Sequence, residues 1–178
     1  LSLALPSLAA SAGWTSIFDG KTLAGWKPTS NANWRVERGA IVADQGKVGL
    51  LVHEDNYRNY ELIVEFKAAR GANSGVFLST KEKPESLMTD CYELNIAPPD
   101  NPFPTGSLVA REKYPDAGET DTWRRFDVRV RNGRVIVKLD GRQILDHEAK
   151  PAASGIRIGL QKNSGRVAFR NIRARKLD

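Results

Sequence analysis

A run of alternating residues near the carboxyl end constrains the fold most tightly. Between residues 125 and 148, apolar and polar residues alternate with a period of two, which is the pattern of half-buried β-strands. Asn132-Gly133 and Asp140-Gly141 interrupt this run, and each dipeptide is typical of a two-residue type I′ hairpin turn, in which both central residues take positive φ. We therefore predict three consecutive antiparallel strands over residues 125–131, 134–139 and 142–148.

The same alternation recurs along most of the chain. It is clearest in the segments 60–67, 74–79, 91–96 and 156–161, and no window shows a 3.6-residue period over two turns. About a dozen short strands separated by turn residues are typical of a β-sandwich. We therefore predict an all-β fold, built as a two-sheet antiparallel β-sandwich or jelly roll.

The amino-terminal segment differs from the rest of the chain. Residues 1–12 read LSLALPSLAASA, carry no charge and end in the small-x-small pattern Ala10-Ser11-Ala12, which is typical of an export-signal cleavage site. We predict that residues 1–12 are a signal-peptide remnant or a disordered arm, and that residues 13–178 form one domain of a periplasmic or secreted protein. The segment is too short to span a bilayer, so we expect no stable membrane insertion.

The composition excludes several kinds of site. Cys91 is the only cysteine, which excludes an internal disulfide and a cysteine-rich zinc site. The two histidines, His53 and His147, are too few for a multi-histidine metal site, although an oxygen-ligand site for calcium or magnesium stays open. We predict no metal and no cofactor. The formal charge of +6 is spread over strand-like segments rather than concentrated in a block, so we expect no nucleic-acid partner.

Short motifs follow one another in a recognisable order from residue 14 onward. They are Phe18-Asp19-Gly20-Lys21-Thr22-Leu23, Gly25-Trp26, Trp34-Arg35-Val36-Glu37, Tyr60-Glu61-Leu62 with Glu65-Phe66, Asn73-Ser74-Gly75-Val76-Phe77-Leu78, Tyr92-Glu93-Leu94-Asn95-Ile96, Thr105-Gly106-Ser107-Leu108, Trp123, Asp140-Gly141, Gly159-Leu160-Gln161 and Phe169-Arg170-Asn171-Ile172. In this order they resemble the 3-keto-disaccharide hydrolase domain family, formerly a domain of unknown function. The resemblance implies a concanavalin A-like lectin or glucanase sandwich that cleaves the glycosidic bond of oxidised, 3-keto glycosides.

Two departures from that family pattern fall where a pocket is expected. Lys162-Asn163 follows Gln161, where many members of the family carry Asp-His. Ser79, which alternation places on the outer face of its strand, stands where many members carry arginine. A non-catalytic carbohydrate-binding module, directed to acidic glycans by the net charge, is therefore the alternative to an enzyme, and a scaffold without a ligand pocket is the third interpretation.

Alternation also assigns candidate site residues to the faces of their strands. If the four alternating segments between residues 60 and 161 share a sheet, their non-core face carries Glu65, Phe77, Glu93, Asn95 and Gln161. An aromatic side chain beside carboxylates and amides is the composition of a sugar groove. The other interpretation is an ordinary polar outer face with Phe77 tucked under a loop.

Glu65 and Glu93 form the predicted catalytic pair. Two carboxyl groups supply the acid and the nucleophile or base of glycoside hydrolysis, although Glu65 is equally interpreted as the partner of a strand lysine or arginine. A 3-keto sugar changes the chemistry, because the ketone acidifies the hydrogen on C2 and one base can then start an elimination. We assign Glu93 as that base, with Gln161, Asn95 or Arg111 near the oxyanion. The predicted carbohydrate-binding residues are Asn73, Phe77, Asn95, Arg111, Trp123 and Gln161.

Overall fold

The computed structural model describes residues 13–116, 118 and 120–178. The predicted signal-peptide remnant, residues 1–12, lies outside these described residues. The elements that they form are strands, and no helix among them is long and apolar enough to cross a membrane.

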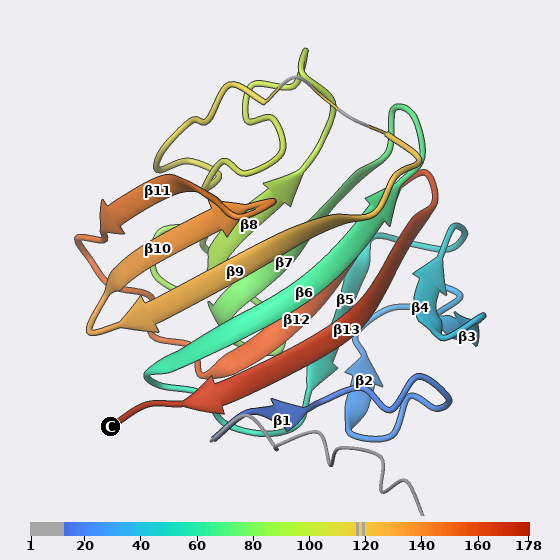
Figure 1. Cartoon of the computed structure of the whole chain (residues 1–178), viewed down its shortest axis with the longest axis horizontal. Coiled ribbons are helices and arrows are strands. Elements are labelled where there is room, and N and C mark those ends of the chain that lie inside the picture. The colour runs from blue at the N-terminus through green and yellow to red at the C-terminus, as the bar shows by residue number, and fades with distance from the viewer. Residues whose placement is uncertain (1–12, 117, 119) are drawn as a thin grey trace, which may run out of the picture.

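Two antiparallel sheets stack face to face, and Figure 1 shows the larger sheet in front of the smaller one. The eight-stranded sheet contains, in spatial order, β11 (Arg142–Glu148), β10 (Arg134–Leu139), β9 (Arg124–Arg131), β6 (Tyr60–Ala68), β13 (Val167–Lys176), β4 (Ala40–Ala43) and β3 (Arg35–Glu37), with β1 (Thr15–Ser16) also paired to β13. The five-stranded sheet contains β2 (Trp26–Pro28), β5 (Gly49–His53), β12 (Arg157–Ser164), β7 (Asn73–Thr80) and β8 (Tyr92–Ile96). The predicted two-sheet antiparallel sandwich is confirmed.

The meander β9–β10–β11 forms as the sequence predicts. Asn132 and Gly133 take φ values of 49° and 80°, and Asp140 and Gly141 take 52° and 83°, so both central residues of each turn have positive φ. These values belong to the left-handed region that a type I′ turn requires, and their twist matches that of the flanking strands. The two hairpins place three arginine-rich strands side by side at one edge of the larger sheet.

The hydrophobic core lies between the two sheets. Tyr60, Leu62, Val64 and Phe66 of β6 are all buried there, on the face that alternation predicts. Phe66 stacks on Phe126 of β9, with ring centroids 4.5 Å apart. Burying an aromatic or large aliphatic side chain contributes about 1.5–3 kcal/mol, so this alternation is the main source of the sandwich's stability.

A second, smaller apolar cluster lies on the other side of the five-stranded sheet. It consists of Leu50, Val52, Phe77 and Cys91, and Leu87 packs against it from the loop that follows β7. These side chains point away from the core but are buried, because this loop folds back over the sheet. This loop therefore covers part of the outer face of the smaller sheet.

Candidate functional site

The two predicted catalytic carboxylates lie on different sheets. Glu65 belongs to β6 of the eight-stranded sheet, and Glu93 belongs to β8 of the five-stranded sheet. Both point away from the core, so they face opposite sides of the sandwich. Glu65 accepts a hydrogen bond from Arg170 Nε at 2.6 Å. It is therefore the partner of a strand arginine, which was the alternative to a catalytic role. The predicted Glu65–Glu93 pair is therefore wrong.

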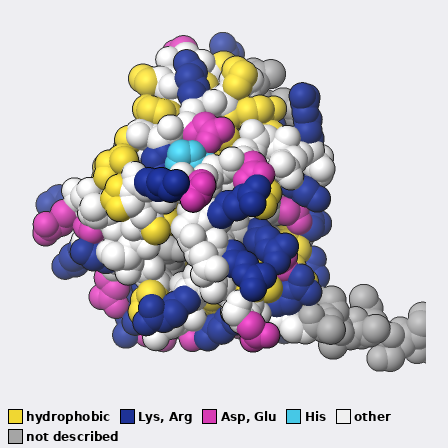
Figure 2. Space-filling model, turned by 90° about the vertical axis from the view of Figure 1, so that its left-hand side faces the viewer, with side chains coloured by type: hydrophobic (Ala, Val, Ile, Leu, Met, Phe, Trp, Pro, Cys, Tyr) yellow, Lys and Arg dark blue, Asp and Glu magenta, His cyan; other side chains and the backbone are white. Residues whose placement is uncertain are grey.

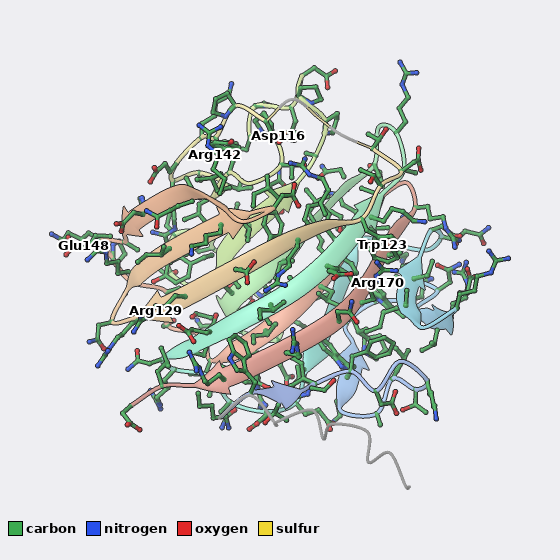
Figure 3. The ribbon with its side chains drawn as sticks, in the orientation of Figure 1. Asp116, Trp123, Arg129, Arg142, Glu148 and Arg170 are labelled. Atoms are coloured by element: carbon green, nitrogen blue, oxygen red, sulfur yellow. The ribbon has the colours of Figure 1, made fainter. Side chains whose placement is uncertain are left out.

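Trp123 also lies on the side of Glu65. It precedes β9 and packs against an apolar cluster on the outer face of the larger sheet. The guanidinium of Arg170 lies 3.9 Å from the centroid of its ring, and Figure 3 shows the two residues beside each other. Trp123 cannot share a groove with Glu93, because β9 is in the other sheet.

The cross-strand register of the smaller sheet brings the other predicted residues together. Two neighbouring rows of cross-strand partners, which we call rungs, run across β5, β12, β7 and β8 in that order. The first rung consists of Val52, Gly159, Phe77 and Glu93, and the next consists of Leu50, Gln161, Gly75 and Asn95. All eight lie on the face away from the core. Glu93, Phe77 and Gln161 are therefore neighbours on one surface, as predicted.

Gly75 allows Glu93 to reach toward β12. It separates Gln161 from Asn95 on its rung, and a Cβ atom at this position would lie 3.4 Å from Glu93 Cγ and 3.6 Å from Glu93 Oε1. The Glu93 carboxyl group thus occupies the space above Gly75 and forms a hydrogen bond with Gln161. These are ordinary van der Waals distances, so an alanine at position 75 would touch the carboxyl group, and only a longer side chain would compete with it for the same space.

Glu93 and Gln161 lie on the floor of a cavity of about 340 Å³. Leu50 and Phe77 form the apolar part of this floor, and residues 82–87 form one wall. The cavity is lined by Thr29, Val48, Gly49, Leu50, Phe77, Glu82, Lys83, Pro84, Glu85, Ser86, Leu87, Glu93 and Gln161. We call it the Glu93 cavity. An apolar floor with a few convergent polar groups is the usual form of a small-molecule site.

Burial changes the chemistry of the Glu93 carboxyl group. Loss of water around it disfavours the charged form and raises the pKa of Glu93 to about 7, although the hydrogen bond from Gln161 opposes this shift. A carboxyl group with a pKa near neutrality takes up and releases protons at physiological pH. Raised carboxyl pKa values are concentrated in active sites, which makes Glu93 the best candidate for a general base.

Gln161 has an unused hydrogen-bond acceptor at the same place. Its side chain is only 8% exposed, and its Oε1 atom is buried with no hydrogen-bond partner among the described residues. A buried polar atom without a partner costs about 1–3 kcal/mol. A hydroxyl group that donates to this oxygen would remove that cost, so Gln161 is a candidate ligand-binding residue.

The wall of the cavity is fixed by Asp90. Its Oδ2 atom accepts hydrogen bonds from the backbone N–H groups of Glu85 at 3.0 Å and Ser86 at 3.3 Å. Its Oδ1 atom lies 2.8 Å from Lys81 Nζ, and this hydrogen bond is the largest of the effects that lower the pKa of Asp90. Asp90 therefore stays ionised and holds residues 82–87 against the sheet.

Besides Trp123, three predicted binding residues do not line the Glu93 cavity. Asn95 is buried and donates from Nδ2 to the carbonyl oxygen of Phe103, which fastens the loop that follows β8. Arg111 donates to the carbonyl oxygens of Leu87 and Met88 and lies over the ring of Tyr92. It therefore holds the end of the loop whose residues 82–87 form the wall of the cavity. Asn73 stands at the start of β7, opposite Ser164. Asn95 and Arg111 thus hold neighbouring loops in place.

The sequence-based prediction missed the residues of the wall. Glu82, Lys83 and Glu85 line the cavity from a loop that has no periodic pattern. Thr29 and Val48 approach from the opposite side, and Val48 is 57% exposed, which is unusual for a valine. The exposure of an apolar residue such as Val48 is recognised only in the structure, so the sequence carried no signal for these lining residues.

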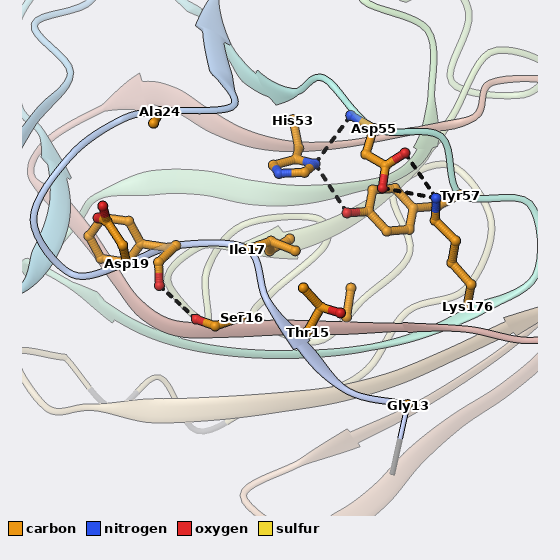
Figure 4. A pocket seen from close by; sticks show the side chains of 12 residues that line it. Gly13, Thr15, Ser16, Ile17, Asp19, Ala24, His53, Asp55, Tyr57 and Lys176 are labelled. Carbon is orange, nitrogen blue, oxygen red and sulfur yellow. Dashed lines mark hydrogen bonds and ion pairs between the residues drawn. The ribbon is translucent and has the colours of Figure 1, made fainter. Parts of the chain in front are cut away.

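A larger cavity, of about 540 Å³, lies at the end of the sandwich where β1 meets β13 (Figure 4). It is lined in part by His53, which is half-buried. His53 Nδ1 accepts hydrogen bonds from the Asp55 N–H group at 3.3 Å and the Tyr57 hydroxyl at 3.1 Å. Burial lowers the pKa of His53, so the ring is neutral. Among the described lining residues, no carboxyl group has a raised pKa, so the Glu93 cavity remains the candidate site.

Known proteins of similar sequence or structure share the β-sandwich fold described above. A 3-keto-disaccharide hydrolase of Bacteroides thetaiotaomicron is 36% identical over 82 residues, which cover 39% of this chain but only 28% of that protein. A crystal structure from Parabacteroides distasonis, of a protein proposed to be a glycosyl hydrolase, superposes with a TM-score of 0.80 at 24% identity and covers 93% of this chain and 94% of that one. The carbohydrate-binding module CBM66 of Bacillus subtilis superposes with a TM-score of 0.66 at 11% identity over 92% and 96% of the two chains. The two structures show the shared fold alone.

The sequence profile of one family covers nearly the whole described chain. It matches residues 13–175, which include both sheets and every residue of the Glu93 cavity. The chain belongs to the 3-keto-alpha-glucoside-1,2-lyase-like domain family.

Proposed function

We propose that the Glu93 cavity binds a 3-keto glycoside and cleaves its glycosidic bond by elimination followed by addition of water. The family makes this a carbohydrate-active protein. The observation that carries the finer proposal is the pairing of a buried carboxyl group of raised pKa with a buried amide oxygen that lacks a partner. Action in the periplasm or outside the cell is part of the proposal and rests on the pattern of residues 1–12.

The reaction begins with removal of a proton from the sugar. The Glu93 carboxylate takes the hydrogen from C2, and the electrons of that C–H bond form a C2–C3 double bond while the ketone becomes an enolate. The enolate then re-forms the ketone, a C1–C2 double bond forms, and the bond from C1 to the glycosidic oxygen breaks. The protonated Glu93 returns its proton to the leaving oxygen. Water adds across the C1–C2 double bond, with its hydroxyl group on C1 and its proton on C2.

The cavity contains groups suited to each step. Gln161 orients the sugar through the hydroxyl group that its Oε1 accepts, and its amide N–H₂ group donates to the carboxylate. Lys83 and Ser86 in the wall are the other donors available to the enolate oxygen. Phe77 and Leu50 offer an apolar surface to the face of the sugar ring. Glu82 and Glu85 supply further carboxyl groups close to the leaving oxygen.

The first test is turnover of an oxidised disaccharide. The protein is incubated with 3-keto-trehalose, with trehalose as the matched substrate without the ketone, and the products are analysed by mass spectrometry. The proposal predicts that 3-keto-trehalose is cleaved and trehalose is not, because only the ketone acidifies C2–H. If the protein binds 3-keto-trehalose without cleaving it, the proposed enzyme activity is wrong and the protein is a carbohydrate-binding module instead.

The pH dependence of the reaction follows from the pKa of Glu93. A base works only when ionised, and the pKa of Glu93 is about 7, so kcat/KM should rise with pH through neutrality and level off above about pH 8. At pH 6 the ionised fraction is about one tenth, so kcat/KM should be about tenfold below the plateau. A profile of kcat/KM against pH measures this directly. A flat profile between pH 5.5 and 8.5 would be inconsistent with Glu93 as the base.

A further inference from the structure

The outer face of the eight-stranded sheet carries two adjoining hollows that the Glu93 cavity does not use. Their volumes are about 400 Å³ and 520 Å³, and both are lined by Arg129 and Ile136, which join them into one surface. We call this surface the Arg129 face. The Glu93 cavity lies on the opposite sheet, so the two surfaces can be occupied at the same time.

The floor of the Arg129 face is apolar. Ile63 of β6 and Ile136 of β10 point outward here, where alternation normally places polar residues, and Ile63 is only 9% exposed. Trp14 closes one end of the surface, with the guanidinium of Arg175 lying 5.0 Å from the centroid of its ring. Apolar and aromatic groups of this kind pack against the C–H face of a sugar ring.

The rim of the Arg129 face is cationic. The two hollows are lined by the five cations Arg129, Arg131, Arg134, Lys138 and Arg175 and by the three acids Glu61, Asp127 and Glu148. Figure 2 shows Lys and Arg side chains gathered on the right of that view, the side that faces the reader in Figure 1. Figure 3 labels Arg129 on this face. The excess of cations favours an anionic ligand.

Three of these cations are poorly neutralised. Arg175 and Arg134 form close ion pairs with Glu61 and Asp146. Arg129 approaches Glu61 only to 3.9 Å, and among the described residues neither Arg131 nor Lys138 forms an ion pair. All three are exposed, so their charges are available to a ligand.

We propose that the Arg129 face binds an anionic polysaccharide, whose sugar rings pack on the apolar floor and whose carboxylate or sulfate groups meet Arg129, Arg131 and Lys138. From Arg175 on β13 to Lys138 on β10 there are three strand spacings, or about 14 Å, which suits an oligosaccharide rather than a single sugar. Glu61 and Asp127 lie between the cations and disfavour the dense phosphate charge of a nucleic acid. The surface would hold the protein on an acidic polymer while the Glu93 cavity acts on small glycosides.

The test compares a double charge reversal on this face with the same change elsewhere. Binding to polygalacturonate and to chondroitin sulfate is measured by titration calorimetry at low and high salt, with dextran as the neutral polymer and a DNA duplex as the other polyanion. The variant R131E/K138E removes two of the free cations, and K21E/R70E makes the same change in net charge at exposed residues that line neither hollow. The unfolding midpoints of both variants check that they are folded.

We expect the natural protein to bind at least one acidic polysaccharide in a salt-sensitive way and not to bind dextran. R131E/K138E should weaken that binding about tenfold or more, and K21E/R70E should weaken it less than about threefold. Cleavage of 3-keto-trehalose should be the same in both variants, so failure of this inference is distinct from failure of the proposed function. Equal losses in the two variants, tighter binding to DNA, or no binding to either acidic polymer would overturn it.

Discussion

Replacing Glu93 with glutamine is expected to lower kcat/KM for 3-keto-trehalose about a thousandfold. Glutamine keeps the shape of the side chain and its hydrogen bond to Gln161, but it cannot accept the C2 proton. Loss of a general base typically reduces the rate by about 10²–10⁴-fold. The measurement is kcat/KM at pH 8, where Glu93 of the natural protein is ionised. The free energy of unfolding should not fall, because a buried group that resists ionisation is replaced by a neutral one.

Glu65 provides the matched control for that experiment. It is also a glutamate on a central strand, but it lies on the opposite sheet and is bonded to Arg170. Glu65→Gln should change kcat/KM by no more than about twofold, because Glu65 does not line the Glu93 cavity. If Glu93→Gln kept more than about a tenth of the activity, or if the two variants lost it equally, Glu93 would not be the base.

Replacing Gly155 with alanine should lower the free energy of unfolding by about 3 kcal/mol or more. The segment that leads into β12 passes so close to the end of β7 that a Cβ atom on Gly155 would lie 2.1 Å from Thr80 C, 2.4 Å from Lys81 N and 2.4 Å from Ser79 O. These are backbone atoms, which cannot move aside without disrupting the strand. Overpacking costs about 1–3 kcal/mol and more where the backbone must shift. Thermal unfolding should show a midpoint lower by about 6–12 °C.

The control for Gly155 is Gly20, where space is not limiting. Gly20 has φ +77° and a Cβ atom there would meet nothing within 4 Å, so Gly20→Ala adds only backbone strain of about 1–2 kcal/mol. Comparing the two variants therefore separates the cost of a steric clash at Gly155 from the cost of backbone strain at Gly20. A Gly155→Ala protein that was as stable as Gly20→Ala would show that β7 and the segment before β12 are not packed as tightly as described.

The faces of individual strands were predictable from the sequence. Alternation correctly placed Tyr92, Leu94 and Ile96 of β8 in the core, and Glu93 on the opposite side. The Asn-Gly and Asp-Gly dipeptides correctly located both turns of the β9–β11 meander. These features depend on residues adjacent in the chain, because the side-chain period of a strand is a local property.

The assignment of strands to sheets was not predictable in this way. Alternation has the same form in β6 as in β8, and nothing in it indicates that β6 pairs with β9 and β13 while β8 pairs with β7. Register and sheet membership are set by contacts between distant segments. The assumption of one shared sheet therefore brought Glu65 and Trp123 to the wrong side of the molecule.

Local irregularities account for the remaining differences. Ser79 was expected on the outer face of β7, but the pairing register shifts beside it and its φ is +46°. This bulge turns Ser79 toward the core, where its N–H group donates to the hydroxyl of Tyr60 at 3.0 Å. Lys162, the other departure from the family pattern, donates from Nζ to the carbonyl oxygens of Gly46 and Asn163. Neither residue contributes an ionisable group to the Glu93 cavity.

Solvent deuterium at C2 of the released sugar tests most directly whether Glu93 acts as a base on carbon. Cleavage of 3-keto-trehalose is carried out in D₂O, with short reaction times and an enzyme-free control for spontaneous exchange, and the 3-keto-glucose is analysed by mass spectrometry. Elimination followed by hydration predicts that the new hydrogen on C2 comes from solvent, so the product carries deuterium there. A product that keeps its original C2 hydrogen would show direct hydrolysis at C1 and contradict this mechanism.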